Sequence, residues 1–138
     1  MGSDLLLIDT GPLVALLNGR DAEHLRCVEI ADAQPSPMLT TWVVMAEATW
    51  LLRDQYMGLE RLLATVENGV VTCFNLGHDA AAWMAEFARQ YQDLHPQLVD
   101  LSLAYLAERE GTSHIFTLDR RDFLVLKSRT GKPFDLVP

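Results

Sequence analysis

The chain has 138 residues, of which 49% are hydrophobic, and it carries a formal net charge of −8. This length suits one domain, and the hydrophobic content is enough for a sizeable core, which argues against a disordered chain. The net acidity argues against a protein that coats nucleic acid through its charge alone. The charge is uneven, because residues 1–119 hold 17 acidic and 6 basic side chains, whereas residues 120–138 hold 2 acidic and 5 basic ones.

The sequence favours a soluble, cytoplasmic protein with no membrane partner. The apolar run of residues 5–8 is short and follows Asp4 rather than basic residues, so it does not resemble a signal peptide. No apolar stretch approaches the roughly 20 residues that a membrane span needs. Cys27 and Cys73 lie in apolar surroundings and match neither a disulfide framework nor a zinc spacing, so we expect two reduced core residues.

Short apolar runs alternate with longer segments of helical periodicity along the chain. Strands are expected at Asp4–Ile8, Met38–Thr40, Val70–Phe74, His114–Leu118 and Phe134–Val137. Helices are expected to begin at Thr10, to follow Asp21, to run from a cap at Thr40 or Thr41 to Gly58, and to span Leu59–Glu67, His78–Tyr91 and Gln97–Glu110. The strands lack an alternating polar face, as expected when helices cover both faces of a sheet. The pattern predicts a single α/β domain over residues 1–138 with a mostly parallel sheet.

Two carboxylates follow predicted strands. Asp9 ends the first strand, and Asp119 follows the fourth, within the segment TLDRRDF at residues 117–123. Taken alone, this segment is better explained as a polar turn, because Asp favours both turns and helix N-caps. In open parallel sheets, however, functional sites lie at the carboxyl ends of the strands. Asp9 and Asp119 would therefore open onto one edge of the sheet, as neighbours if their strands are adjacent.

Two further acids on predicted helices have mostly apolar residues as sequence neighbours. Glu47 has Val43 and Trp50 as its neighbours four residues before and three residues after it, which weakens the interpretation of a solvated helix face. Asp100 lies within an equally apolar segment. A structural role could also explain Asp100, because it lies in the first turn of its predicted helix, where the helix dipole favours an acid.

Convergence of these four acids would demand a cation. Two carboxylates about 4 Å apart repel by about 4 kcal/mol at an effective dielectric constant of 20, so a cluster must take up protons or bind metal. Oxygen ligands without neighbouring His or Cys favour Mg²⁺ or Mn²⁺ over zinc. Such ions can activate water and stabilise a leaving oxygen, which is chemistry suited to cutting a phosphodiester.

Four segments of the chain together resemble the PIN-domain ribonucleases, and most closely the VapC-type toxins of bacterial toxin–antitoxin pairs. In order, they are Ile8–Leu13, Met45–Ala48, Leu98–Leu103 with Ala107–Glu108, and Thr117–Phe123. The ending Lys132–Pro138 is similar too, so the resemblance spans nearly the whole chain. It implies a Rossmann-like three-layer α/β/α sandwich and Mg²⁺-dependent cleavage of single-stranded RNA. It also implies a homodimer and inhibition by a small antitoxin whose tail enters the active-site groove.

The resemblance also implies roles for individual residues. The catalytic and metal-binding acids would be Asp9, Glu47, Asp100 and Asp119, and Asp122 matches an additional acid that some members use. Thr10 and Thr117 match hydroxyl positions that could orient a carboxylate or a water, while Arg120 or Arg121 could meet an RNA phosphate or an antitoxin carboxylate. Many relatives carry Ala-Asp-Ala around the third acid, where this chain has Val99 and Leu101 as flanks. We expect these bulkier flanks to pack in the core or to alter the groove.

Two other functions remain open. The first is a catalytically weak PIN-like binding module that acts mainly through its antitoxin complex. The second is a phosphoryl-transfer enzyme or receiver domain of similar build. The phosphatase pattern requires a second Asp two residues after the first, where this chain has Gly11. The receiver pattern requires paired acids near the first strand and a late Lys after a strand, which TLDRRD does not supply, so this second function ranks below the first.

Overall fold

The computed structural model describes residues 5–127 and 131–138. Asp4, expected in the first strand, and residues 128–130 of the basic C-terminal segment lie outside the described residues. In the described part of the chain, five strands form one sheet in the order β3-β2-β1-β4-β5, and every neighbouring pair is parallel. The strands are β1 (Leu6–Ile8), β2 (Met38–Thr41), β3 (Val71–Phe74), β4 (His114–Phe116) and β5 (Asp135–Val137).

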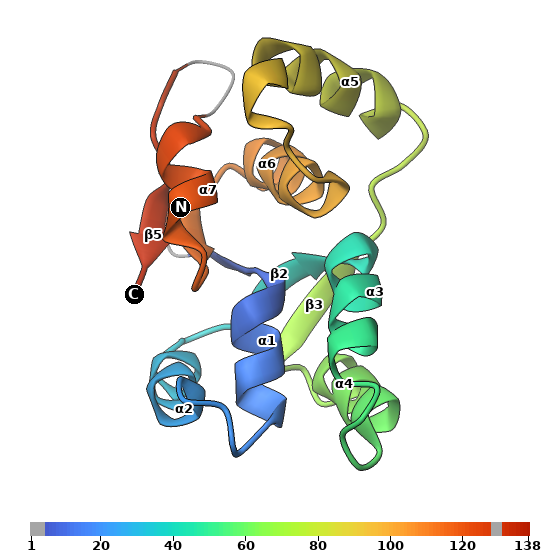
Figure 1. The fold of residues 1–138 in the computed structure, drawn as a ribbon, viewed down its shortest axis with the longest axis vertical. Coiled ribbons are helices and arrows are strands. Elements are labelled where there is room, and N and C mark those ends of the chain that lie inside the picture. The colour runs from blue at the N-terminus through green and yellow to red at the C-terminus, as the bar shows by residue number, and fades with distance from the viewer. Residues whose placement is uncertain (1–4, 128–130) are drawn as a thin grey trace.

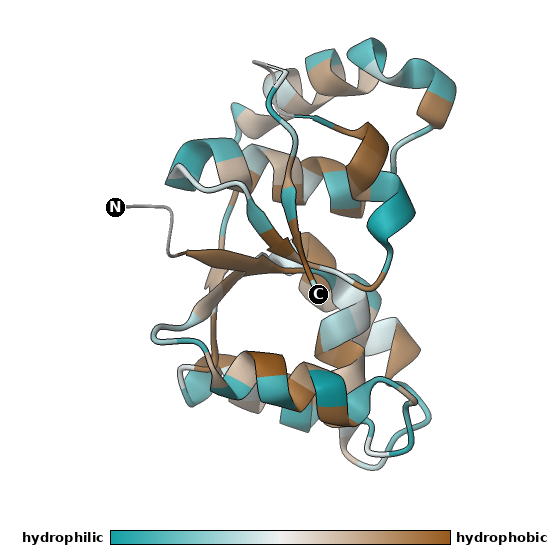
Figure 2. Ribbon diagram, turned by 90° about the vertical axis from the view of Figure 1, so that its left-hand side faces the viewer, coloured by the Kyte–Doolittle hydropathy of each residue, from teal (hydrophilic) through white to brown (hydrophobic). Residues whose placement is uncertain are grey.

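Helices cover both faces of this sheet, which confirms the expected α/β/α sandwich (Figure 1, Figure 2). One side carries α1 (Thr10–Leu17), α2 (His24–Asp32) and α4 (Gly58–Glu67), and the other carries α5 (Ala80–Gln90), α6 (Leu98–Glu110) and α7 (Arg120–Val125). Helix α3 (Trp42–Leu51) contacts both α1 and α6. A short 3₁₀ turn, η2 (Gln92–Leu94), follows α5. None of the helices that the structure describes has both the length and the apolar composition to traverse a lipid bilayer.

The central strands are apolar on both faces because helices pack against each face. Leu7 and Ile8 of β1 and Ile115 and Phe116 of β4 are all fully buried. The buried core extends from these strands to both helical layers, and on the α5 side Trp83 stacks on Phe87. Burial of this kind, at about 25 cal/mol per Å² of apolar surface, is the main stabilising contribution to such a sheet.

The order in which the chain adds strands to the sheet reverses between β1 and β4. The chain moves from β1 outward through β2 to β3, then returns past β1 to β4 and continues to β5. Consequently α1, which follows β1, and α7, which follows β4, leave the sheet on opposite sides (Figure 1). Divergence of this kind opens a crevice at the carboxyl ends of two adjacent strands, where open α/β sheets bind ligands.

The end of the expected long helix differs from the prediction. Helix α3 ends at Leu51, and Gly58 begins α4 instead of ending α3. A Cβ atom at Gly58 would lie 2.4 Å from the carbonyl oxygen of Leu52, so only glycine allows the chain to turn this closely. Helix α7 (Arg120–Val125) was not expected, because residues 117–123 were explained as a polar turn. The other helices and the strands were predicted to within a few residues, and Thr41 caps α3 by accepting a hydrogen bond from the Val44 amide at 3.2 Å.

Candidate active site

Asp9 lies at the crevice between β1 and β4 and is held at both of its carboxylate oxygens. It follows β1 directly, and the register pairs Ile8 with Phe116, so Asp9 stands beside Thr117. Oδ1 accepts a hydrogen bond from the Thr10 amide at 2.8 Å, and Oδ2 accepts one from the Thr117 hydroxyl at 2.8 Å. Only 8% of Asp9 is exposed, so these two bonds fix the direction of a nearly buried carboxylate.

Thr117 connects Asp9 with the second acid of this edge. Its hydroxyl oxygen accepts a hydrogen bond from the Asp119 amide at 3.0 Å, and the same hydroxyl donates a hydrogen bond to Asp9. Asp119 itself is exposed. One fully buried threonine therefore orients the Asp9 carboxylate and fixes the backbone at Asp119.

Asp100 approaches the same edge from the start of α6. It is 7% exposed, and its Oδ2 accepts the Gln97 amide at 3.4 Å, so it also caps the helix as the first-turn alternative supposed. A buried pair that the sequence interpretation missed fixes α6 against β2. The Thr41 and Ser102 hydroxyl oxygens lie 2.9 Å apart, and Ser102 also donates to the Val99 carbonyl at 2.8 Å.

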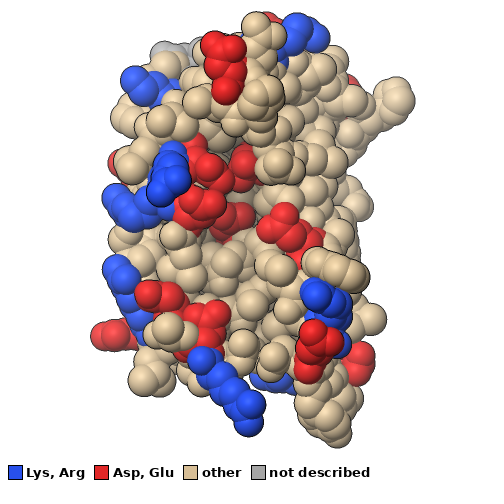
Figure 3. Space-filling view, in the orientation of Figure 1, with Lys and Arg blue, Asp and Glu red and all other residues tan. Residues whose placement is uncertain are grey.

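One cavity of about 200 Å³ collects the predicted acids. The side chains around it are Asp9, Glu47, Gln97, Val99, Asp100, Asp119 and Asp122. Glu47 is exposed on α3, so its apolar neighbours do not mean that it is buried. Figure 3 shows the acidic side chains gathered where α7 faces α6, with basic side chains along one side. The structure therefore brings all five predicted acids to one hollow.

The family comparison agrees with this geometry. Residues 6–127 match the PIN domain family. The chain belongs to the PIN domain family. A curated relative, ribonuclease VapC26 of Mycobacterium tuberculosis, is 29% identical over 136 residues, which are 96% of this chain and all of the relative.

Two solved structures share the PIN fold of this chain. VapC20 of M. tuberculosis, a toxin that cleaves the sarcin–ricin loop, superposes with a TM-score of 0.73 at 20% identity, over 80% of this chain and 86% of that one. The DNA-bound VapBC complex of Salmonella typhimurium superposes with a TM-score of 0.62 at 16% identity, over 96% of this chain and 97% of that one.

The crowding of acids in the PIN site is visible in their pKa values. Burial is the main factor that raises the pKa of Asp9, and the charges of Glu47 and Asp119 add to it, against the hydrogen bonds from Thr10 and Thr117. Burial, with the charges of Asp9 and Asp122, raises the pKa of Asp100 to about 7. Burial also raises the pKa of Asp122, as do a hydrogen bond with Asp119 and its charge, while Arg121 lowers it. Without a cation, these acids thus resist full ionisation near neutral pH.

These shifts predict a pH dependence of stability in metal-free protein. Asp100 binds its proton more tightly in the folded than in the unfolded chain, so the free energy of unfolding should fall as the pH rises from about 4 to about 7. Denaturant unfolding in EDTA across this range measures the slope. Asp100→Asn keeps an oxygen to accept the Gln97 amide, and its slope should be flatter. Equal slopes for the two proteins would contradict the assignment.

The donor set suits a hard divalent cation. Within residues 5–127 and 131–138, no three Asp, Glu, His or Cys side chains are arranged so that they could hold a metal ion together. Mg²⁺ commonly takes only one or two protein carboxylates and completes its shell with water and phosphate oxygens, so an all-oxygen pair such as Asp9 and Asp119 fits it. Among the described residues, the Thr10 hydroxyl is also buried beside this site without a hydrogen-bond partner.

The remaining predicted residues occupy the rim of the PIN site. Arg120 donates a hydrogen bond to the carbonyl of Pro138, so this guanidinium is engaged within the chain. Arg121 lies on α7 beside Asp122 and lines a second, neighbouring cavity. Of the two bulky flanks of Asp100, Leu101 is buried in the core, whereas Val99 is half-buried and lines the acidic cavity. Val99 also packs against the core, so both flanks contribute to it, and an effect of Val99 on the groove stays a prediction.

Proposed function

We propose that this chain is a metal-dependent endoribonuclease that cleaves single-stranded RNA and acts as the toxin of a toxin–antitoxin pair. The convergence of Asp9, Glu47, Asp100, Asp119 and Asp122 on one hollow at the switch point of the sheet is the observation that carries this proposal. The curated relative named a ribonuclease supports the substrate class. We also propose that residues 1–138 form one domain, since β5 pairs with β4 and Phe134 packs edge-to-face on Phe123.

The reaction is hydrolysis of a phosphodiester, in which a water oxygen attacks phosphorus and the bond to one ribose oxygen breaks. Asp9 and Asp119 would hold Mg²⁺ or Mn²⁺, and Asp100 and Glu47 line the same hollow. When bound, the cation supplies positive charge for the phosphate oxygens and lowers the pKa of a coordinated water. Thr117 keeps Asp9 oriented through the 2.8 Å hydrogen bond, and the buried Thr10 hydroxyl would help to orient a carboxylate or a water beside the hollow.

The rim of the hollow and the comparisons support the proposed partners. Arg121 beside the hollow is suited to an RNA phosphate or to a carboxylate of a protein partner, while Arg120 stabilises the contact between α7 and Pro138. The Salmonella complex supports a small antitoxin as that partner. A homodimer and a cytoplasmic location belong to the same proposal and come from the resemblance to VapC-type toxins.

Cleavage of a mixed single-stranded RNA pool by the antitoxin-free protein tests the proposal. We expect cuts with Mg²⁺ and with Mn²⁺, none with EDTA, and none in a single-stranded DNA pool of the same sequences. Sequencing the new ends would define the preferred site. Cleavage that persists in EDTA, or DNA that is cut as fast as RNA, would contradict the assignment.

The alternative is a catalytically weak module that acts through its partner complex. The raised pKa values of Asp9, Asp100 and Asp122 are the observation behind it, because protonation would let the hollow keep its acids without a cation. The two functions differ in whether metal binds the isolated chain, and that measurement is argued in the Discussion.

A further inference from the structure

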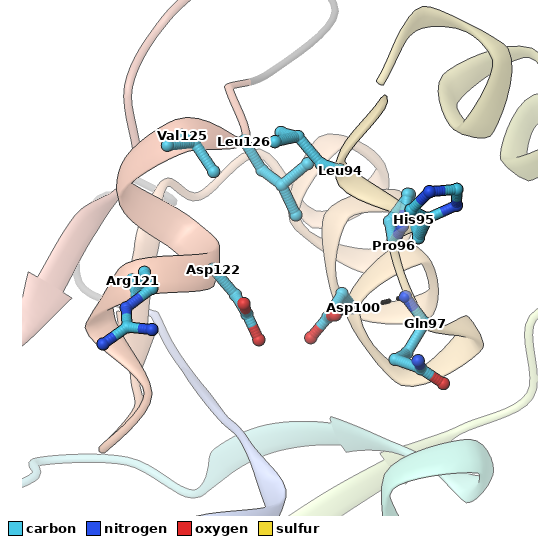
Figure 4. A pocket seen from close by; sticks show the side chains of 9 residues that line it. All are labelled: Leu94, His95, Pro96, Gln97, Asp100, Arg121, Asp122, Val125 and Leu126. Carbon is cyan, nitrogen blue, oxygen red and sulfur yellow. Dashed lines mark hydrogen bonds between the residues drawn. The ribbon is translucent and has the colours of Figure 1, made fainter. Parts of the chain in front are cut away.

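A second cavity, of about 500 Å³, opens beside the acidic hollow and shares part of its wall. It lies between the loop after α5 and helix α7 (Figure 4). Its lining is Leu94, His95, Pro96, Gln97, Asp100, Arg121, Asp122, Val125 and Leu126. Gln97, Asp100 and Asp122 line both cavities, so a molecule bound at the acids continues directly into this second pocket.

Hydrogen bonds tie the two walls of this pocket together. Tyr91, just before η2, donates its hydroxyl proton to the Lys127 carbonyl at 3.3 Å and accepts the Lys127 amide at 3.1 Å. Lys127 follows Leu126 at the end of the opposite wall. The loop wall itself turns at His95, whose φ of 47° and ψ of 57° are left-handed and whose amide bonds to the Gln92 carbonyl at 3.2 Å. The pocket is therefore formed before any ligand arrives, as small-molecule sites usually are.

The two ends of the pocket differ in chemistry. Figure 4 shows the carboxylates of Asp100 and Asp122 directed toward one another at one end, while the side chains of Leu94 and Leu126 approach each other at the other end. Val125 extends the apolar end. The two acids at its entrance disfavour a second phosphate inside the pocket, and Figure 4 shows the Arg121 side chain directed away from Asp100, where it can contact a phosphate outside. The interior therefore accepts a neutral, flat, partly apolar group.

We propose that this pocket binds the base of the nucleotide next to the scissile phosphate, an inference that rests on the proposed ribonuclease function. The phosphate would lie at the acidic hollow, and its neighbouring base would lie between the loop wall and α7. The side chains of Leu94, Val125 and Leu126 offer apolar contact to the face of the base, and Gln97 offers an amide to its polar edge. A base held in a duplex cannot enter, so the pocket selects unpaired RNA.

Charge and continuity favour a nucleotide over a peptide. The charges of a basic peptide would pair with Asp100 and Asp122. Its charged side chains would find no favourable contact at the apolar end of the pocket. A nucleotide uses both ends, since its phosphate requires the acidic hollow with its cation and its base requires the apolar end. The pocket also fixes the distance between the cut bond and one base, which gives the enzyme a sequence preference at a single position.

Methyl NMR spectra of the full chain, labelled at Leu and Val, test this assignment directly. In the presence of Mg²⁺, at least one of AMP, CMP, GMP and UMP should shift the methyl signals of Leu94, Val125 and Leu126. Ribose 5-phosphate, which lacks a base, should leave them unchanged. Nucleotides that shift none of these signals would overturn the proposal, as would equal shifts from ribose 5-phosphate or shifts only with a basic pentapeptide.

A matched pair of variants tests the same pocket during RNA cleavage. Val125 and Leu124 are both exposed on α7, but only Val125 lines the pocket, so neither substitution threatens the core. Val125→Trp should raise KM for single-stranded RNA by about tenfold, within the range that one stacked base contributes. Leu124→Trp should keep the wild-type KM, and an unchanged or lowered KM in Val125→Trp would overturn the assignment. RNA cleavage by wild-type protein without any methyl response to nucleotides would reject the base pocket alone, whereas absent cleavage with a methyl response would reject the nuclease.

Discussion

Replacing Asp9 with asparagine should lower the rate of RNA cleavage by about 10²–10³-fold while leaving the protein as stable as the wild type or more so. The amide can still accept the Thr10 amide proton and can donate to Thr117, so the geometry is kept. What is lost is the negative charge that would hold a cation. Because burial and the nearby acids raise the pKa of Asp9, a neutral side chain removes an unfavourable charge from the folded state.

Single-turnover cleavage and thermal unfolding, measured on the same preparations, separate these two effects. Asp54→Asn is the matched control, since Asp54 is an exposed acid that does not line the hollow. It should leave both cleavage and stability unchanged. Cleavage by Asp9→Asn at the wild-type rate would remove Asp9 from the site. A large loss of stability would instead make its role structural.

The sequence was sufficient for the architecture, because local patterns determine most of it. The fully apolar strands predicted helices on both faces, and a cap at Thr40 or Thr41 was expected from the chemistry of these residues, with Thr41 as the cap in the structure. Contacts between distant residues were not predictable in this way. The turn at Gly58 depends on close approach to Leu52, and the left-handed His95 lies in a loop that Tyr91 ties to Lys127, 36 residues away.

The convergence of the acids could be predicted in part, because a rule of topology links Asp9 to Asp119. Both follow parallel strands, and the structure makes those strands neighbours at the point where the sheet reverses. Glu47 and Asp100 lie on helices, whose rotation about their own axes the sequence leaves open. Their directions depend on tertiary contacts such as the Thr41–Ser102 pair, which joins residues 61 apart and carries no sequence signal.

The neighbouring pocket could not be foreseen from the sequence. Its walls come from the loop after α5 and from α7. In the sequence, the loop was marked only by a proline, and the segment of α7 resembled a polar turn. The sequence identified His95 only as a loop residue and Gln97 only as the start of a helix. In the folded chain, both line one pocket with Asp100. A pocket of this kind arises from the packing of distant elements, so its specificity is the property least visible in the sequence.

Addition of Mg²⁺ or Mn²⁺ should raise the melting temperature of the isolated chain, because a cation relieves the repulsion among the clustered acids. A ligand present at ten times its dissociation constant stabilises the folded state by about 1.4 kcal/mol, which corresponds to about 5 °C for a domain of this size. The shift should be larger at pH 8 than at pH 6. Asp100 has a pKa of about 7 without metal, so at the lower pH the cation must first displace its proton.

Differential scanning fluorimetry with metal and with EDTA, on matched variants, decides between enzyme and binding module. Asp119→Asn should abolish the shift, and because Asp119 is exposed the variant should fold normally. Asp54→Asn should retain the shift in full. If neither metal changed the melting temperature of the wild-type protein, the result would support the binding module. The hollow would then keep its acids together through protonation alone. A shift that survives in Asp119→Asn would place the cation elsewhere in the hollow, and it would transfer the role of Asp119 to Asp100 or Asp122.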